Sequence, residues 1–533
     1  MQNKIVENWL TNVGELTFTI PFCQLLLSQG MRVVHISSQG PMEQGKDVIA
    51  VDRAGRVYCY QLKAGNITGR VWAGIKSEID ELVELPPKHP SLPATVDEWD
   101  AYLVTNGTIT NATSRTIQDY SEAKKAAGHR PLRTVVRGEL LGDFADHFGD
   151  FLPVEITDLQ SFLELYNQSG ESDLDCEKFK RYFEGFFAGH APISRKKKTE
   201  AVQAALILSS YLLTYKYAAG NRIEIIKAHT LLLAGIYQFA ESSELTETSW
   251  RDTEQLIYDA LEIEFRGLID ELAAHTTHFV ESQGGLLSET VTYKLRCNEL
   301  IGYLSAYLVY CGLRGVEPYR PTEIDAVLER IKTHAVIAGE CVVPLLINAS
   351  LAQYARGNTQ EAAKILVSLL GTVLRANVPG GRGLPSPYYT MAEAMEWALN
   401  IGERRITESF QGRSFCLRSV VLLLARLGQR DVLATVWRTI SYVSQLEVVP
   451  DESAEYLSWR IVKGVHTDRF ADTPQSWAKL VTEAKASYTD ALPSVLQDRM
   501  YFMPFWINAM PQRFNHRVVL TLCSAIDEAR CRA

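Results

Sequence analysis

The best candidates for chemistry are an acid, an amide and a lysine in the first part of the chain. Asp47 comes directly before the apolar run 48–51, and Gln61 and Lys63 end the alternating run 57–63. A short turn sequence with a glycine separates the two runs, which predicts two strands joined by a tight turn. Because both strands rise by the same length per residue, Asp47 is expected to lie beside Gln61 and Lys63.

Oxygen donors at such a sheet edge predict a site for a hard divalent cation. Mg²⁺ takes oxygen ligands and usually keeps several waters. The carboxylate of Asp47, the carbonyl of Leu62 and the amide oxygen of Gln61 would supply such ligands. Lys63 would orient or deprotonate a metal-bound water and stabilise negative charge on a phosphate. The structural alternative is an ordinary cross-strand pair between Asp47 and Lys63 at the rim of a hairpin.

Strands and helices alternate around this hairpin over the first 155 residues. A helical pattern covers 3–29, where Pro21 is expected to kink the helix or to start a second one, and a strand is expected at 31–36. The later pattern predicts helix 71–85, strand 101–105, helix 114–127, strand 132–136 and helix 138–148. The alternation predicts an α/β domain at residues 1–155 with a sheet of mixed pairing.

This order of elements resembles the PD-(D/E)xK restriction-endonuclease-like nucleases, and most closely their Mrr-like branch, which carries QxK. Asp47 matches the aspartate of the family motif, and the sequence Gln61-Leu62-Lys63 matches its (D/E/Q)xK element. Glu15 resembles the glutamate that the family carries on its first helix, and Glu7 is the competing candidate for that ligand. Gln61 departs from the acidic residue that is usual in the family.

The resemblance implies a restriction-endonuclease-like fold in this region and hydrolysis of DNA phosphodiester bonds. It implies catalytic roles for Asp47, Gln61, Lys63 and Glu15, and a Mg²⁺ or Mn²⁺ ion held by Asp47, Gln61, Leu62 and Glu15. RNA stays open as a substrate, because a metal site alone does not distinguish the 2′-hydroxyl of RNA.

Beyond Pro153 the pattern changes to long segments with helical periodicity, which predicts an all-α region at 156–533. Helices are expected in close succession up to 376 and again between 389 and 529, among them 430–444 and 452–464. Two segments, 353–366 and 423–437, share a helix–Gly turn–helix rhythm that resembles tetratricopeptide hairpins. Because the period is not sustained, we expect an irregular helical array, divided into two lobes near 377–387.

Composition is that of a soluble globular protein, with 46% hydrophobic and 22% charged residues among 533. The formal net charge of −9 argues against coating of nucleic acid by counterion release alone. The nine cysteines form no CxxC pair, and the N-terminus lacks the apolar core of a signal peptide, so we expect a cytoplasmic protein that does not enter membranes.

The function expected from these features is a metal-dependent endonuclease that acts in bacterial defence against phage or foreign DNA. The helical region is expected to regulate it through self-association or through a separate sensor protein. The defence role rests on a likeness of architecture alone. The rival hypothesis is a catalytically idle nuclease fold that serves as a scaffold or sensor subunit.

Overall fold

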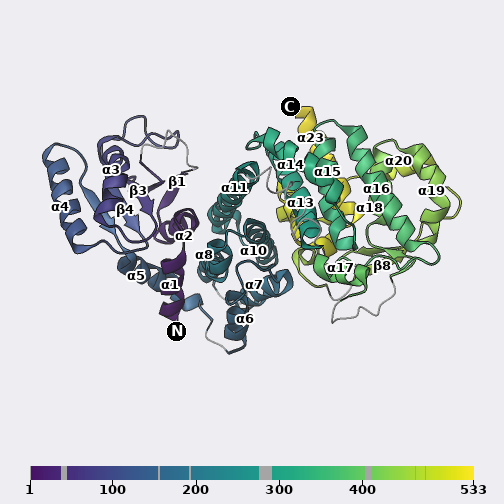
Figure 1. The fold of residues 1–533 in the computed structure, drawn as a ribbon, viewed down its shortest axis with the longest axis horizontal. Coiled ribbons are helices and arrows are strands. Elements are labelled where there is room, and N and C mark those ends of the chain that lie inside the picture. Colours follow the sequence, from purple (N-terminus) through teal and green to yellow (C-terminus); the bar gives the residue numbers. More distant parts are fainter. Residues whose placement is uncertain are drawn as a thin grey trace. The chain divides into compact units, whose positions relative to one another are not determined.

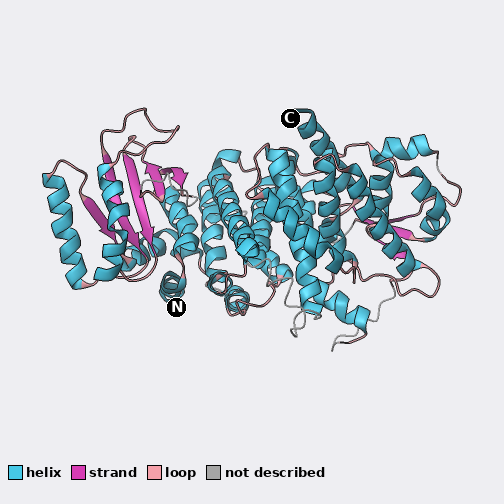
Figure 2. Cartoon of the chain, turned by 45° about the horizontal axis from the view of Figure 1, so that its top comes forward, coloured by secondary structure: helices cyan, strands magenta, loops and turns pink. Residues whose placement is uncertain are grey.

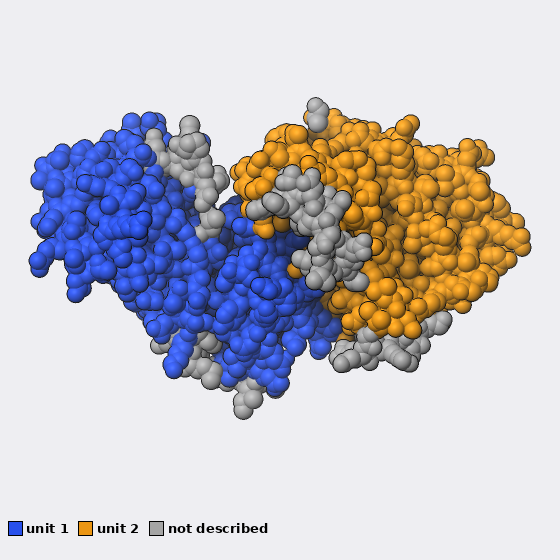
Figure 3. Space-filling view, in the orientation of Figure 1, with its two compact units in different colours: residues 1–264 blue, residues 265–533 orange. Residues whose placement is uncertain are grey.

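The computed structural model describes residues 2–37, 45–153, 156–190, 194–274, 291–401, 410–461, 464–474 and 476–532. The chain divides into two compact units, residues 1–264 and 265–533, which are coloured blue and orange in Figure 3. Within the described ranges, no helix combines the length and the apolar character needed to cross a membrane.

The first unit holds a five-stranded sheet, drawn in magenta in Figure 2. Its strands are β1 (Arg32–Ile36), β2 (Val48–Val51), β3 (Val57–Lys63), β4 (Trp99–Thr105) and β5 (Leu132–Val135). They lie side by side in sequence order. The β1–β2 and β2–β3 pairs are antiparallel, whereas β3–β4 and β4–β5 are parallel. The expected α/β region with mixed pairing is confirmed.

Helices cover both faces of this sheet (Figure 1). They are α1 (Gln2–Asn12), α2 (Glu15–Ser28), α3 (Gly69–Glu84), α4 (Asn111–Ala126) and α5 (Arg137–Phe148). On one face, Cys59 of β3 shares a buried core with Ile79 of α3 and Ile117 of α4. On the other face, Phe22 of α2 meets Tyr60 edge to face, with ring centroids 5.2 Å apart. The sheet is therefore a central layer between two helical layers.

The break between the first two helices does not fall at Pro21. α1 ends at Asn12, Gly14 precedes α2, and α2 continues through Pro21. Proline inside a helix removes one backbone hydrogen bond. Phe18 and Phe22, which are 1% and 3% exposed, bury this part of α2 and favour the helix in spite of that loss.

The first unit continues well past residue 155. Its further helices are α6 (Ile156–Tyr166), α7 (Cys176–His190), α8 (Arg195–Leu212), α9 (Thr214–Ala218), α10 (Arg222–Ser242) and the first part of α11 (Arg251–Ala274). Trp9 of α1 packs against both Phe144 of α5 and Tyr211 of α8, with ring centroids 5.1 Å apart in each case. The compact units therefore divide at 264/265, and not at 155 or near 377–387, where the sequence suggested boundaries.

The second unit is mainly helical. Its helices are α13 (Val291–Arg314), α14 (Pro321–Ile331), α15 (Val343–Ala355), α16 (Thr359–Asn377), α17 (Met391–Leu399), α18 (Leu417–Arg426), α19 (Arg430–Tyr442), α20 (Trp477–Ala484), α21 (Ser494–Gln497), α22 (Met503–Ala509) and α23 (His516–Arg532). The two segments with a helix–Gly–helix rhythm form the hairpins α15–α16 and α18–α19. Gly357 and Gly428 turn them with positive φ angles of 83° and 75°, which glycine adopts without steric cost.

A small sheet interrupts the helices of the second unit. It consists of β6 (Arg413–Ser414), β7 (Ser444–Val448) and β8 (Val465–Asp468), in that order. The expected helix at 452–464 is wrong, because its described residues, 452–461 and 464, hold a 3₁₀ turn at Ser453–Leu457 and no α-helix. The large helical region that the sequence predicted is thus present, but it contains a sheet that the sequence did not predict.

Candidate active site

The β2–β3 hairpin brings Asp47 to the end of β3, as the sequence predicted. Val48 pairs with Tyr60, and the Asp47 backbone N–H donates to the Tyr60 carbonyl at 2.9 Å. The carboxylate oxygen Oδ2 of Asp47 accepts from the Leu62 N–H at 2.6 Å and from Gln61 Nε2 at 2.7 Å. The side chain of Asp47 is therefore fixed by two donors of the QxK segment.

Lys63 joins this group through α2. Its ammonium Nζ lies 3.1 Å from Oε1 of Glu15, in the first turn of α2. Glu7, the competing candidate, is an exposed residue of α1, and it is the Glu15 carboxylate that pairs with Lys63. The break between α1 and α2 produces this placement, because it puts Glu15 at the start of a helix that packs against the sheet.

Glu78 of α3 is a member of the site that sequence analysis missed. Its Oε2 lies 3.1 Å from Lys63 Nζ and 3.3 Å from Gln61 Nε2. Side chains alternate along a strand, so Gln61 and Lys63 share the α3 face of β3 with Cys59. Glu78 directly precedes the buried Ile79 on α3. The sequence gives one indication of Glu78, namely an acid on the helix that follows the QxK strand. Because amphipathic helices commonly carry such acids, this indication does not single out Glu78.

Asn106, at the end of β4, ties the site to the elements around it. Its Nδ2 donates to the Val13 carbonyl at 2.7 Å, and its Oδ1 accepts from the Gly65 N–H at 2.6 Å. Thr105 Oγ1 donates to the Gly65 carbonyl at 2.6 Å. These bonds hold the turn before α2 and the loop after β3 in place, and so position Glu15 and Lys63. The sequence suggested only that the chain turns here.

Burial controls the charge of Asp47. Desolvation raises the pKa of Asp47 from 3.8 to about 6, against the opposing effects of the Leu62 N–H and of Lys63. The neighbouring carboxylates of Glu15 and Glu78 raise it further. Asp47 therefore takes up a proton near pH 6 and is ionised at neutral pH.

Lys63 stays charged. Burial alone would lower the pKa of Lys63, but Glu15 and then Glu78 outweigh burial through their charges and hydrogen bonds, so this pKa is raised. The site thus holds a charged ammonium beside the carboxyl groups of Glu15, Glu78 and Asp47. Such an ammonium stabilises negative charge, and it is a poor base.

The oxygen donors of the site fit a hard divalent cation in their chemistry. Gln61 Oε1 is buried without a hydrogen-bond partner, while the Gln61 NH₂ group faces two carboxylates. The Leu62 carbonyl points toward the same edge of β3 as its N–H, which meets Asp47. Mg²⁺ is commonly held by one or two carboxylates together with waters. In the described part of the chain, no three His, Cys, Asp or Glu side chains form a ready-made metal cluster.

The orientation of the Gln61 amide differs from the prediction, which placed the amide oxygen toward the metal beside Asp47. In the structure its nitrogen faces Asp47 and Glu78, because carboxylates can only accept hydrogen bonds when ionised.

The chain was compared with family models, with curated proteins and with solved structures. No match was found in any of the three.

Proposed function

We propose that this chain is a metal-dependent nuclease that hydrolyses phosphodiester bonds in DNA. The observation that carries the proposal is the convergence of Asp47, Gln61 and Lys63 from one hairpin with Glu15 from α2. The mixed sheet with Glu15 on a preceding helix supports the resemblance to PD-(D/E)xK nucleases that the sequence suggested. Glu78 extends the acidic set by one residue.

Asp47 and Glu15, with Glu78 and the Leu62 carbonyl, would hold the cation. Gln61 would join them only with its amide turned over, so that Oε1 takes the place that Nε2 has beside Asp47 and Glu78. A bound Mg²⁺ or Mn²⁺ ion would supply a Lewis acid for the phosphate and for an attacking water. Lys63 keeps its proton and stabilises the charge that develops on the phosphate oxygens. Asp47, whose pKa lies near 6, is ionised at neutral pH and so is available as a ligand for the cation.

The helical part of the chain supports a second element of the proposal, namely control of the nuclease by a protein contact. We place this control on the outer helices of the two hairpins, α16 and α19, each of which buries one face and leaves the other exposed. The contact is either self-association or a separate sensor protein, and the setting is defence against foreign DNA. Light scattering of the full chain and a pull-down from the native host test it: a strictly monomeric chain that recovers no partner would contradict it.

The second candidate function is a catalytically idle fold that acts as a scaffold or sensor. Lys63 is held by two carboxylates, Glu15 and Glu78, and such a closed ion-pair network is also a sufficient structural role for these residues. Purified chain incubated with plasmid DNA and with RNA, in Mg²⁺, Mn²⁺ or chelator, separates the candidates. Degradation that requires a metal supports the nuclease, and intact nucleic acid under every condition supports the idle fold.

A further inference from the structure

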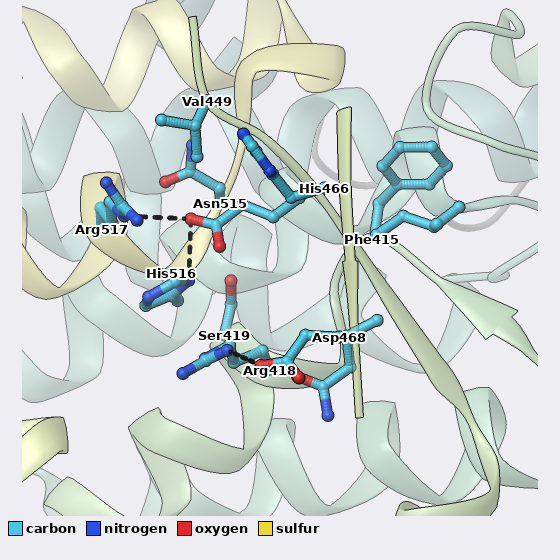
Figure 4. A pocket seen from close by; sticks show the side chains of 12 residues that line it. Phe415, Arg418, Ser419, Val449, His466, Asp468, Asn515, His516 and Arg517 are labelled. Carbon is cyan, nitrogen blue, oxygen red and sulfur yellow. Dashed lines mark hydrogen bonds and ion pairs between the residues drawn. The ribbon is translucent and has the colours of Figure 1, made fainter. Parts of the chain in front are cut away.

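A cavity of about 260 Å³ lies in the second unit, between the β7–β8 strands and the helices α18 and α23. Figure 4 shows Arg418 and Ser419 of α18, His466 and Asp468 of β8, and the start of α23 around it. All of its lining residues belong to the second unit. The cavity is separate from the nuclease site, whose residues lie in the first unit.

The strands present an unusually polar face to this cavity. Gln445 pairs with Asp468 and Glu447 pairs with His466 in the antiparallel β7–β8 ladder. Side chains at 445 and 447 share one face, as do their cross-strand partners. His466 and Asp468 lie on the exposed strand β8, where polar side chains are usual. Gln445 is buried, so its polar side chain is the one that packing does not explain.

Two buried side chains in the lining lack hydrogen-bond partners. Gln445 is 4% exposed, and neither its amide oxygen nor its amide nitrogen has a partner. Ser419 is 1% exposed, and its hydroxyl also has none. Buried polar atoms are paired in the great majority of cases. Both side chains line the cavity, so a molecule in the cavity would be their partner.

Carboxylates outnumber the arginines around the cavity. Arg418 pairs with Asp468 at 2.9 Å and with Glu483 at 2.6 Å, and Arg517 pairs with Glu447 at 3.2 Å. His516 also lies 3.2 Å from Glu447, but burial, with help from the two arginines, lowers its pKa to about 3, so it is neutral. The cavity therefore has no surplus cation to attract a phosphate or a carboxylate. A neutral polar ligand fits it better.

We propose that this cavity binds a neutral, planar ligand that presents a hydrogen-bond donor and an acceptor side by side, as the edge of a nucleobase does. The amide of Gln445 is the complement of such an edge, and Gln pairs with adenine through two bonds of this kind. Phe415 also lines the cavity and supplies an aromatic surface for a flat ring. The volume lies just below the roughly 300 Å³ of the smallest common ligand pockets, so a free base or nucleoside fits better than an oligonucleotide.

The test is binding to the full chain, measured by calorimetry and thermal shift. Adenosine, guanosine, uridine, cytidine and their free bases form one arm. Nicotinamide, a carboxamide with the same edge but no nucleobase, forms the other. We expect a nucleobase or nucleoside to bind with a Kd below millimolar and to raise the melting temperature. Binding of nicotinamide alone, or of nothing in either arm, would overturn the nucleobase assignment.

Gln445→Leu is the decisive variant. Leucine keeps the approximate volume and removes both amide atoms, so ligand affinity should fall at least about tenfold. The free protein should be as stable as the wild type or more so, because an unpaired buried amide has been removed. Gln411→Leu, at an exposed position outside the cavity, is the matched control and should bind normally.

Two outcomes with this variant would contradict the proposal. One is unchanged affinity in Gln445→Leu, which would place the ligand elsewhere. The other is loss of stability in the free variant, which would show that the amide serves the fold. Ser419→Ala provides a second, smaller change at the same cavity and should weaken the same ligand.

Discussion

Glu15 Oε1 and Lys63 Nζ lie 3.1 Å apart, although the two residues are 48 positions apart in the chain. The pair joins the first turn of α2 to the last residue of β3, and it brings the helix-borne acid to the end of the QxK strand. If this acid takes part in cation binding, Glu15→Gln should reduce cleavage by roughly 10- to 100-fold, the usual effect of removing a group that supports a metal site. Glu7→Gln, on the exposed side of α1, is the matched control and should cleave at the wild-type rate.

An equal loss in Glu7→Gln and Glu15→Gln would contradict the assignment of Glu15. The cleavage rates are compared at saturating Mn²⁺ and again at limiting Mn²⁺, because the loss of a metal ligand lowers the rate most when the metal concentration is low.

Gln61→Glu tests how this side chain relates to the cation. Glutamate adds a charged oxygen at nearly constant shape beside Asp47 and Glu78, which both now receive the Gln61 NH₂ group. Without metal, three close acids repel one another and the melting temperature should fall. With Mn²⁺ the variant should recover and should bind the ion at least as tightly as the wild type, by calorimetry.

Asp47→Asn is the counterpart of that variant, and it should bind Mn²⁺ more weakly, since it removes a carboxylate from the site. If Gln61→Glu lost metal binding with its fold intact, the placement of this side chain beside the cation would be wrong.

The chain after β4 passes so close to the loop that follows Lys63 that position 107 has room only for glycine. A Cβ atom at Gly107 would lie 2.2 Å from the Gly65 carbonyl oxygen, which is backbone and cannot move aside cheaply. Gly107→Ala should therefore destabilise the protein by at least about 2 kcal/mol and disturb the site.

Gly74→Ala is the control for this change. Gly74 lies on the exposed side of α3, and an added Cβ meets no atom within 4 Å. Alanine should stabilise that helix by roughly 0.5–1 kcal/mol. Urea denaturation of both variants measures the two changes in the free energy of unfolding. A Gly107→Ala variant as stable as the wild type, or a destabilised Gly74→Ala variant, would contradict the packing described.

Glu340 should make the second unit sensitive to pH. Burial raises the pKa of Glu340 from 4.5 to about 7, although Ser414 and the Phe415 N–H donate to its carboxylate. The folded state thus binds a proton at Glu340 more tightly than the unfolded state, so the contribution of Glu340 to stability is fully present below pH 4.5 and is lost as the pH rises through 7. A shift of this size corresponds to about 3 kcal/mol.

Glu340→Gln should remove this dependence, so that the variant gains in melting temperature relative to the wild type as the pH rises from 5 to 8. Glu396→Gln, an exposed residue of α17, should leave the pH profile unchanged. A constant difference between Glu340→Gln and wild type across this range would contradict the raised pKa.

The sequence predicted the sheet well because its strands carry strong local patterns. The apolar run of β2 and the alternation in β3 also set the register that places Asp47 beside Gln61. Glu78 could not be predicted, since its place in the site depends on how α3 packs on the sheet. The role of Asn106 could not be predicted either, because its partners, Val13 and Gly65, lie far away in the chain.

The small sheet of the second unit was missed for a different reason. In β7, Leu446 and Val448 do alternate with Gln445 and Glu447, but over only five residues that directly follow α19. The helical pattern of the preceding segment dominates such a short window.

Cleavage of plasmid DNA by the purified full chain, with and without Mg²⁺ or Mn²⁺, tests the central claim most directly when Lys63→Ala is assayed beside the wild type. The account predicts metal-dependent cleavage that falls by about 100-fold or more in Lys63→Ala, with its fold preserved. Lys76→Ala, an exposed lysine of α3, should cleave as the wild type does. Intact plasmid with every metal, or equal cleavage by wild type and Lys63→Ala, would contradict the account.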